Sequence, residues 1–361
     1  MSENWRTARE QLRTAFATGA DRVAGRLRLR AEDIVLNATM LGSVGVGKTT
    51  LLASMYERFT HVVGSAIDLN IVPERETSRI LSSYVTTLKE LPTNLVVSKA
   101  LDGTAKVRHY AFEVGTTGRA PAFTLRFTDY PGRYLLPDRY EDQSRVEAAL
   151  ADSDVVLIAV DTPALMHDNG RFHEMINVPM VVTDEVKRLF GASPEPRLIV
   201  LTLLKSETYL GSPEAADRLI ETVKERYRPL LDFLAAGELR ARAGCVVAAV
   251  QTIGSIRLFK VDTDDRGRPT FQFRSTQIGG TYAPLDTEQP LRYLLRFVIN
   301  KYRTDGRPVL RGVWDHLSGA EARLISAVEE FARECKTSGG FAVVQDHALL
   351  HAPAADTPWR R

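Results

Sequence analysis

The stretch MLGSVGVGKTT, residues 40–50, decides how this chain folds. From Gly42 to Thr49 it matches the pattern G-x-x-x-x-G-K-[ST]. The apolar run at residues 33–41 before the match is typical of a buried strand, and the apolar spacing of residues 49–59 after it is typical of a helix. A strand, a glycine-rich loop and a helix in this order are the context that the motif requires.

The residue types of this loop suit phosphate binding. Glycines let successive backbone N–H groups converge on phosphate oxygens, and the helix N-terminus adds a partial positive charge. We expect Lys48 to reach the β- and γ-phosphates of a nucleotide as a catalytic group, and the Thr49 hydroxyl to bind Mg²⁺. The nucleotide-binding residues predicted from this stretch are Gly42, Ser43, Val44, Gly45, Val46, Gly47, Lys48, Thr49 and Thr50.

A second motif, D-x-x-G, follows at residues 129–132. It ends an alternating segment at residues 123–129, which together with residues 109–114 predicts a β-hairpin. At the end of a strand, Asp129 is expected to hold Mg²⁺ through water, and the Gly132 N–H to contact a γ-phosphate. Such tetrapeptides are also frequent in ordinary turns, so a plain turn stays the alternative.

The composition is that of an ordinary globular protein. Of its 361 residues, 44% are apolar and 25% are charged, and the net charge of +2 gives no reason to expect nucleic acid as a partner. The two cysteines, Cys245 and Cys335, suit a reducing cytosol. No apolar run reaches the roughly 18 residues of a membrane span. We therefore expect a cytoplasmic protein without a transmembrane segment.

Three further apolar runs, at residues 152–162, 196–207 and 243–252, are of the kind buried in parallel sheets. Segments with helical spacing lie before the first run and between the second and the third, at residues 212–235 in the latter case. This alternation predicts an α/β fold, a three-layer αβα sandwich of the P-loop type. Its sheet would be mostly parallel with one antiparallel edge hairpin, and its ligand would lie at the C-terminal strand ends.

With these two motifs, residues 33–303 resemble the G domains of the translation-factor-like GTPases, the class that includes the Ras-like switches. The resemblance implies a GTP/GDP site with Mg²⁺. Where that family has N-K-x-D or T-K-x-D to read guanine, this chain has Leu-Lys-Ser-Glu at residues 204–207. The resemblance implies that Lys205 lies along the base and that Glu207 accepts its N1–H and exocyclic amine. Backbone N–H groups near Gln251 and Thr252 would serve the base oxygen.

The sequence departs from the Ras-like pattern at two positions that bear on hydrolysis. Arg133 stands where the family has the glutamine that orients the attacking water, and Val44 stands where it usually has glycine. Together these departures predict slow intrinsic turnover or a different arrangement of the catalytic groups. Arg133 is our fourth catalytic candidate after Lys48, Asp129 and Gly132, since an arginine in cis neutralises charge on the γ-phosphate; the alternative is that it faces solvent or a partner.

A long insertion separates the two motifs. It contains a predicted helix at residues 74–91 that ends before Pro92. The family needs a switch threonine that binds Mg²⁺ and senses the γ-phosphate; Thr93 is the candidate and Thr104 the alternative. This layout, together with a predicted helix ending near residue 302, looks similar to bacterial double-GTPase-type proteins.

The remaining segments complete the predicted organisation. An amphipathic basic helix is expected at the N-terminus, packed on the domain, bound to a partner or lying on a membrane. A loop with solvated histidines is expected at residues 163–180, a hairpin at 257–273, and a C-terminal helix at 318–336 followed by a loose tail. The predicted domains are 1–31, 32–303 with insertions at about 50–106, 163–195 and 253–286, and 304–361.

These observations predict a GTP-binding molecular switch. It would be a GTPase that hydrolyses GTP slowly to GDP and phosphate and relays its nucleotide state to a protein effector or regulator. Peripheral membrane contact is not expected, and a homodimer is compatible with the sequence. Two alternatives stay open. One is an ATP-dependent P-loop ATPase or kinase, and the other is a pseudo-GTPase scaffold that binds nucleotide without turnover.

Overall fold

The protein is described by a computed structural model, which covers residues 35–58, 69–93, 96–97, 101, 106–119, 121–135, 147, 150–277, 280–304 and 320–351. The predicted N-terminal helix and the alternative switch residue Thr104 lie outside these residues.

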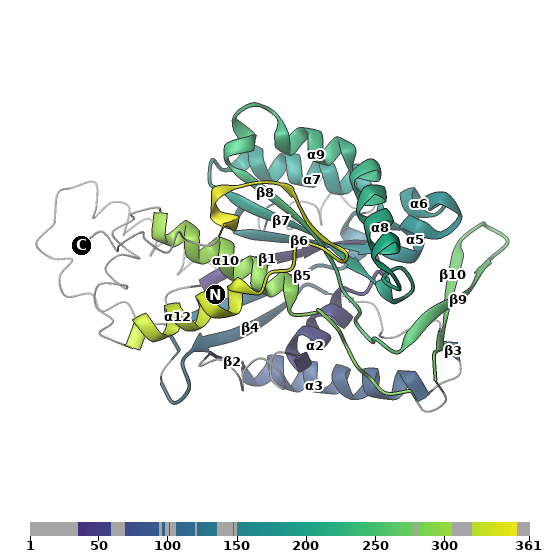
Figure 1. Cartoon of the computed structure of the whole chain (residues 1–361), viewed down its shortest axis with the longest axis horizontal. Coiled ribbons are helices and arrows are strands. Elements are labelled where there is room, and N and C mark those ends of the chain that lie inside the picture. Colours follow the sequence, from purple (N-terminus) through teal and green to yellow (C-terminus); the bar gives the residue numbers. More distant parts are fainter. Residues whose placement is uncertain are drawn as a thin grey trace, which may run out of the picture.

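The centre of the fold is an eight-stranded sheet with the order β11-β8-β7-β6-β1-β5-β4-β2 (Figure 1). Strands β5, β1, β6, β7 and β8 run parallel to their neighbours in this series, while β4, β2 and β11 are antiparallel to theirs. The strands are β1 (Val35–Leu41), β2 (Asn70–Pro73), β4 (Arg108–Gly115), β5 (Phe123–Asp129), β6 (Val155–Asp161), β7 (Arg197–Leu204), β8 (Ala243–Ala249) and β11 (Phe341–Gln345).

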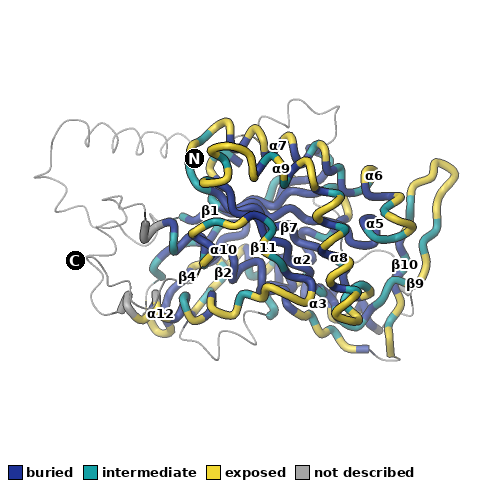
Figure 2. The backbone as a smooth tube through the Cα atoms, turned by 45° about the horizontal axis from the view of Figure 1, so that its top comes forward, coloured by how far each residue is buried: buried dark blue, intermediate teal, exposed yellow. Residues whose placement is uncertain are grey.

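Helices cover both faces of this sheet. One face carries α2 (Lys48–Arg58), α3 (Arg75–Glu90), α10 (Gln289–Thr304) and α12 (Ala320–Arg333); the other carries α7 (Pro179–Ala192), α8 (Pro213–Arg226) and α9 (Arg228–Ala235) (Figure 1). Every residue of β6, β7 and β8 is buried, as continuous apolar strands covered on both faces require. Figure 2 shows the central strands as buried, dark blue tube between the outer helices. The predicted three-layer αβα fold of the P-loop type is confirmed.

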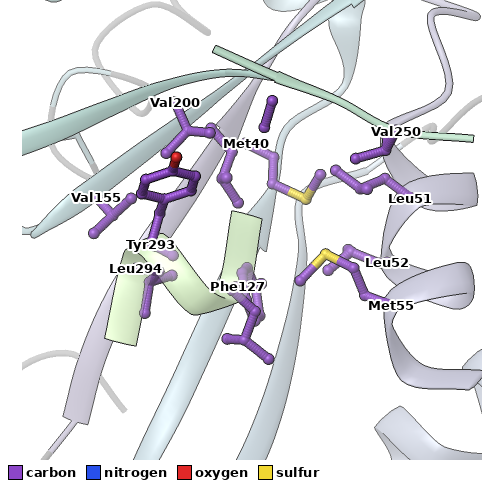
Figure 3. Packing of buried hydrophobic residues seen from close by; sticks show 14 of the residues in the cluster. Met40, Leu51, Leu52, Met55, Phe127, Val155, Val200, Val250, Tyr293 and Leu294 are labelled. Carbon is purple, nitrogen blue, oxygen red and sulfur yellow. The ribbon is translucent and has the colours of Figure 1, made fainter. Parts of the chain in front are cut away.

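Alternate residues of each central strand enter different cores. In β6, Val155 and Leu157 pack toward α2 and α10, whereas Val156 and Ile158 pack toward α7 and α8. Figure 3 shows the first core, where Met40 of β1 lies among side chains of β5, α2 and α10 such as Phe127. The phosphate-loop helix is thus anchored directly on the sheet.

A smaller sheet, β3-β10-β9, stands beside the main one. It consists of β3 (Val96–Val97) and the antiparallel pair β9 (Ile256–Thr263) and β10 (Pro269–Ser275), which extends away from the body of the molecule (Figure 1). This pair is the hairpin predicted at residues 257–273. Asp264 forms its turn, because one carboxylate oxygen accepts the N–H groups of Arg266 and Arg268.

Several expectations need correction. The predicted hairpin β4–β5 exists but is not at an edge, because β2 pairs beyond β4; the opposite edge is β11, which pairs with β8 in the segment expected to be a loose tail. Residues 163–180 do not form a loop, since they fold into α5 (Thr162–Met166), η6 (His167–Gly170), α6 (His173–Asn177) and the start of α7. His173 is 1% exposed rather than solvated.

The helix predicted at residues 212–235 is interrupted at Tyr227, where Pro229 begins a second helix, α9. Among the residues that the structure describes, no helix is both long and apolar enough to cross a membrane.

Candidate nucleotide-binding site

The parallel strands all end at the same edge of the sheet, and each is followed by a segment of the candidate site. The phosphate loop follows β1, Asp129 ends β5, Asp161 ends β6, Lys205 follows β7, and residues 250–254 follow β8. Strand β1 lies between β5 and β6. After β1 the chain first forms the strands on the β5 side of the sheet and then, from β6 on, the strands on the other side. Such a switch point is where α/β sheets bind their ligands.

The phosphate loop depends on glycine for its shape. Gly42, Gly45 and Gly47 have φ angles of 146°, 79° and 113°, which L side chains rarely adopt. At Gly42 a Cβ would also lie 2.8 Å from the Ala159 carbonyl oxygen of β6. The sequence folds into an open backbone loop here because larger residues would be strained or would collide.

Lys48 reaches back over this loop. Its Nζ donates to the carbonyl oxygens of Gly42 at 2.7 Å and Ser43 at 3.2 Å, and the side chain is buried. Burial lowers the pKa of the Lys48 ammonium, and the nearby Asp129 carboxylate partly opposes that effect. A buried ammonium with so little water around it is strongly stabilised when an anionic ligand binds beside it.

The two motifs meet at Thr49 and Asp129. The Thr49 hydroxyl donates to a carboxylate oxygen of Asp129 at 3.0 Å, and Asp129 is 0% exposed. A hydroxyl and a carboxylate at this separation are the oxygen ligands that Mg²⁺ prefers. In the described part of the chain, no group of three or more His, Cys, Asp or Glu side chains is placed to hold a metal ion. Thr49 and Asp129 are the residues that would hold a Mg²⁺ ion here.

Gly132 lies directly against the phosphate loop. A Cβ on Gly132 would be 2.2 Å from both the Ser43 carbonyl carbon and the Val44 nitrogen, so no side chain fits between the two segments. The Val44 side chain points outward and is 60% exposed. The next residue, Arg133, places its guanidinium 5.7 Å from the ring centre of Tyr134.

The half of the candidate site that was predicted to read the base begins at Lys205. This residue has φ 60° and ψ 36°, the left-handed region that is uncommon for residues other than glycine. Its Nζ donates to the Gly45 carbonyl at 3.1 Å and contacts an Asp161 carboxylate oxygen at 2.5 Å. Leu204, which replaces the asparagine or threonine expected from the resemblance, is fully buried and packs beneath Gly47.

Glu207 is turned toward the loop after β8. Its Oε1 accepts the backbone N–H groups of Ile253 at 3.1 Å and Gly254 at 3.4 Å, and the residue is 3% exposed. Burial raises the pKa of the Glu207 carboxyl, and these N–H groups lower it in part. Glu207, the predicted base reader, is thus held in place. The N–H groups that hold it lie two residues further along this loop than Gln251 and Thr252, the residues predicted to face the base.

Gln251 and Thr252 have other contacts in this structure. The Gln251 N–H donates to the Leu285 carbonyl at 3.0 Å, and the Thr252 carbonyl accepts from the Ser54 hydroxyl at 2.9 Å. The Gln251 N–H does not face the site, which leaves Thr252 as the backbone candidate from the sequence. Thr93 ends the short helix η4 (Leu91–Thr93), which lies beside β10; its role as a switch threonine stays a prediction.

Two site residues were missed from sequence. Asp161 pairs with Lys205, and Asn177, sixteen positions later, hydrogen-bonds the Asp161 backbone. A signal existed for Asp161, an acidic residue ending a buried parallel strand next to β1. Asn177 carried no signal, because its partner is set only by the tertiary fold.

The fold and the loop together define the class: a three-layer αβα protein of the P-loop type, with its candidate site at the switch point beside β1.

Comparisons with known proteins give structural likenesses but no sequence match. No family of known proteins and no curated protein matches the chain by sequence. Among solved structures, the chain is similar to the S. cerevisiae Ski7 GTPase-like domain bound to GTP, with 15% identity, a TM-score of 0.38, and coverage of 62% of this chain and 44% of that one. The same domain bound to GDP and inorganic phosphate gives 14% identity, a TM-score of 0.32, and coverage of 61% and 44%.

The chain is also similar to the signal recognition particle receptor SRb-GTP/SRX complex from Chaetomium thermophilum, with 14% identity and a TM-score of 0.34. That likeness covers 61% of this chain and 91% of that chain. This chain therefore spans less than half of the Ski7 chains that it matches. The assignment to the P-loop type rests on the strand order and the loop geometry.

Proposed function

We propose that this protein is a guanine-nucleotide switch that binds GTP with Mg²⁺ and hydrolyses it slowly to GDP and phosphate. The observation that carries the proposal is the 3.0 Å contact between Thr49 and Asp129, residues far apart in sequence that the fold brings to one point. That pair would hold the Mg²⁺ ion, which supplies charge neutralisation to phosphate oxygens. The glycine loop and Lys48 would hold the phosphates themselves.

Guanine recognition would use Lys205 and Glu207. The alkyl stem of Lys205, anchored at the Gly45 carbonyl, offers a flat apolar contact to the base. Guanine presents two N–H donors that adenine lacks, and a carboxylate is the acceptor that pairs with both. In exchange, the Ile253 and Gly254 N–H groups that now bind Glu207 become donors for the guanine oxygen.

The switch would operate through the turn at Asp129 and Gly132. Because Gly132 touches the Ser43–Val44 peptide, any group that enters beside this peptide moves the turn. The γ-phosphate, present in GTP and absent in GDP, is such a group. A protein partner would read the position of this turn, together with the insertion around Thr93. Hydrolysis would be slow, since Arg133 stands in place of the glutamine that orients water.

The first experiment identifies the nucleotide. Purified protein is denatured, any released nucleotide is identified, and the full chain is then titrated with fluorescent mant-GTP, mant-GDP and mant-ATP in the presence of Mg²⁺. We expect guanine nucleotides to bind more tightly than mant-ATP. Lys48→Ala should weaken mant-GTP binding about 100-fold, the loss expected for two charge-assisted contacts. Lys187→Ala, which removes an exposed lysine paired with Asp184, is the matched control.

The second experiment tests turnover and the switch. Phosphate release is measured in single-turnover assays, and amide hydrogen exchange of residues 129–135 is compared with GTP and with GDP bound. We expect slow release and greater protection with GTP. A preference for mant-ATP would favour the ATPase or kinase, and tight guanine binding without any phosphate release would favour the scaffold. Equal protection with both nucleotides would contradict the switch.

A further inference from the structure

Asp161 is a buried carboxylate that does not belong to either phosphate motif. It ends β6 at 2% exposure, and its two oxygens have different partners. One oxygen accepts the Ala164 N–H at 2.9 Å and so caps α5, and the other contacts Lys205 Nζ at 2.5 Å. Taking a carboxylate out of water is costly unless it is paired, so Lys205 and the cap compensate this charge.

Asn177 fixes the backbone of Asp161 from the next layer of structure. Its side-chain oxygen accepts the Asp161 N–H at 2.7 Å, and its side-chain nitrogen donates to the Asp161 carbonyl at 3.1 Å. Asn177 is itself 2% exposed at the end of α6. The backbone N–H and C=O of Asp161 are therefore both held by one side chain, which leaves the Asp161 carboxylate little freedom.

Lys205, in contrast, has a long side chain that is 25% exposed, so it would lose its position without a fixed partner. A second bridge, between the hydroxyls of Thr162 and Ser206 at 3.0 Å, joins the same two strand ends. The ends of β6 and β7 are thus tied together beside Gly45. The geometry holds the Lys205 stem over the phosphate loop before any ligand arrives.

We infer that Asp161 is the positioning residue for Lys205, and that Asn177 keeps Asp161 in register. Asp161 itself touches no nucleotide. It sets the lifetime of the bound nucleotide by holding the Lys205 stem where the base lies, which links α5 and α6 to the base-reading half of the site. This inference rests on the proposed guanine-nucleotide function.

The test is a double-mutant cycle on the full chain, read as the dissociation rate of mant-GDP. Asp161→Asn keeps an oxygen that can cap α5 and removes only the charge, while Lys205→Met keeps the apolar stem and removes the ammonium. We expect each variant to release mant-GDP about tenfold faster, and the double variant to be no faster than Lys205→Met alone. Asp184→Asn, at an exposed pair on α7, is the matched control and should change nothing.

If Asp161 has a merely structural role, the rate increases of the two single variants should multiply in the double variant. If Asp161→Asn releases mant-GDP at the wild-type rate, Asp161 has no role in nucleotide release. Either result overturns the inference. If Asp161→Asn proves unstable in urea, Asn177→Ala provides a second variant. It retains the ion pair but frees the Asp161 peptide, and we expect about threefold faster release. Failure of wild-type protein to bind guanine nucleotide would instead reject the proposed function, a separate outcome.

Discussion

The proposed phosphate-binding half and the proposed base-reading half of the site are built by different means. Around the phosphate loop, backbone carbonyls hold Lys48, and glycines with positive φ angles set the path of the chain. In the base-reading half, side chains hold one another, from Lys205 to Asp161 and from Asp161 to Asn177. A backbone-built site requires particular residues at fixed spacing, whereas a side-chain network allows several chemistries at scattered positions. Only the first kind is visible as a motif.

The largest effect is expected where the backbone leaves no space. Gly132→Ala would place a Cβ 2.2 Å from two backbone atoms of the Ser43–Val44 peptide, which cannot yield as a flexible side chain would. The turn must move away from the phosphate loop, and we expect mant-GTP affinity to fall about 100-fold, the equivalent of an overpacking cost near 3 kcal/mol. Fluorescence titration measures the affinity, and urea unfolding reports any loss of stability.

Gly191→Ala is the control for that variant. Gly191 lies in α7, and a Cβ there meets nothing within 4 Å, so the substitution should leave binding unchanged and stabilise the helix slightly. Unaltered mant-GTP affinity in Gly132→Ala would show that the turn and the phosphate loop are not coupled. The backbone around the phosphate loop would then tolerate a side chain at Gly132, and this half of the site would not depend on glycine there.

An intermediate effect is expected at Glu207, in the side-chain half. Glu207→Gln keeps the shape but replaces one acceptor oxygen with a donor group, so we expect about tenfold weaker mant-GTP binding and no loss for mant-ATP. Competition titrations with both nucleotides measure this ratio. Glu225→Gln on the exposed face of α8 is the control. Equal losses for both nucleotides would mean that Glu207 supports the loop after β8 rather than reading the base.

A smaller effect is expected in stability at the outer end of the side-chain network. His173 contacts Asn177 through its Nδ1 at 3.0 Å, and burial, with help from the nearby Arg226, lowers the pKa of His173 to about 4. The folded state therefore favours neutral histidine, and the stability it contributes above the unfolded pKa is lost as pH falls toward 4. We expect about 1 kcal/mol lower unfolding free energy at about pH 5 than at about pH 7.

Urea unfolding at the two pH values checks this expectation, with His173→Phe as the comparison. That variant keeps an aromatic ring beside Tyr227 but has nothing to titrate, so its pH dependence should be shallower than that of the wild type. Identical slopes would show that protonation of this ring does not disturb the network next to Asn177.

The sequence was sufficient for what periodicity and motif spacing determine. The runs that became β6, β7 and β8 were predicted because buried parallel strands are continuously apolar, and the β9–β10 turn because Asp264 and Gly267 are turn residues. The segment that became α5 to α7 was not predicted. A loop was expected there, but in the structure Pro163 and Pro179 lie in the first turns of helices and Gly170 joins a left-handed turn.

In the site, too, some contacts could be predicted from the sequence and others could not. The contact between Thr49 and Asp129 could be anticipated because both motifs end strands that neighbour each other in the fold. The orientation of Glu207 toward Ile253 and Gly254 could not, since a carboxylate selects among nearby N–H donors only after the chain has folded. Strand β11 was missed because its five residues, beyond a glycine pair, carry too weak a pattern.

The finest distinction between the two halves is their pH dependence, which should have opposite signs. Lys48 must be charged to bind phosphate and its pKa is lowered, so phosphate affinity should fall as pH rises through that pKa. Glu207 must be ionised to accept from guanine and its pKa is raised, so guanine preference should rise as pH rises through that pKa. Adenosine diphosphate lacks both of the donors that guanine offers to Glu207, so its affinity follows the phosphate half, and the ratio of GDP to ADP affinity follows the base half. As pH is raised from about 7 toward about 9, we expect the first to fall and the second to rise. Glu207→Gln should flatten the ratio while leaving the decline of ADP affinity intact. If both curves flatten together, the two halves do not titrate independently and the site works as a single unit.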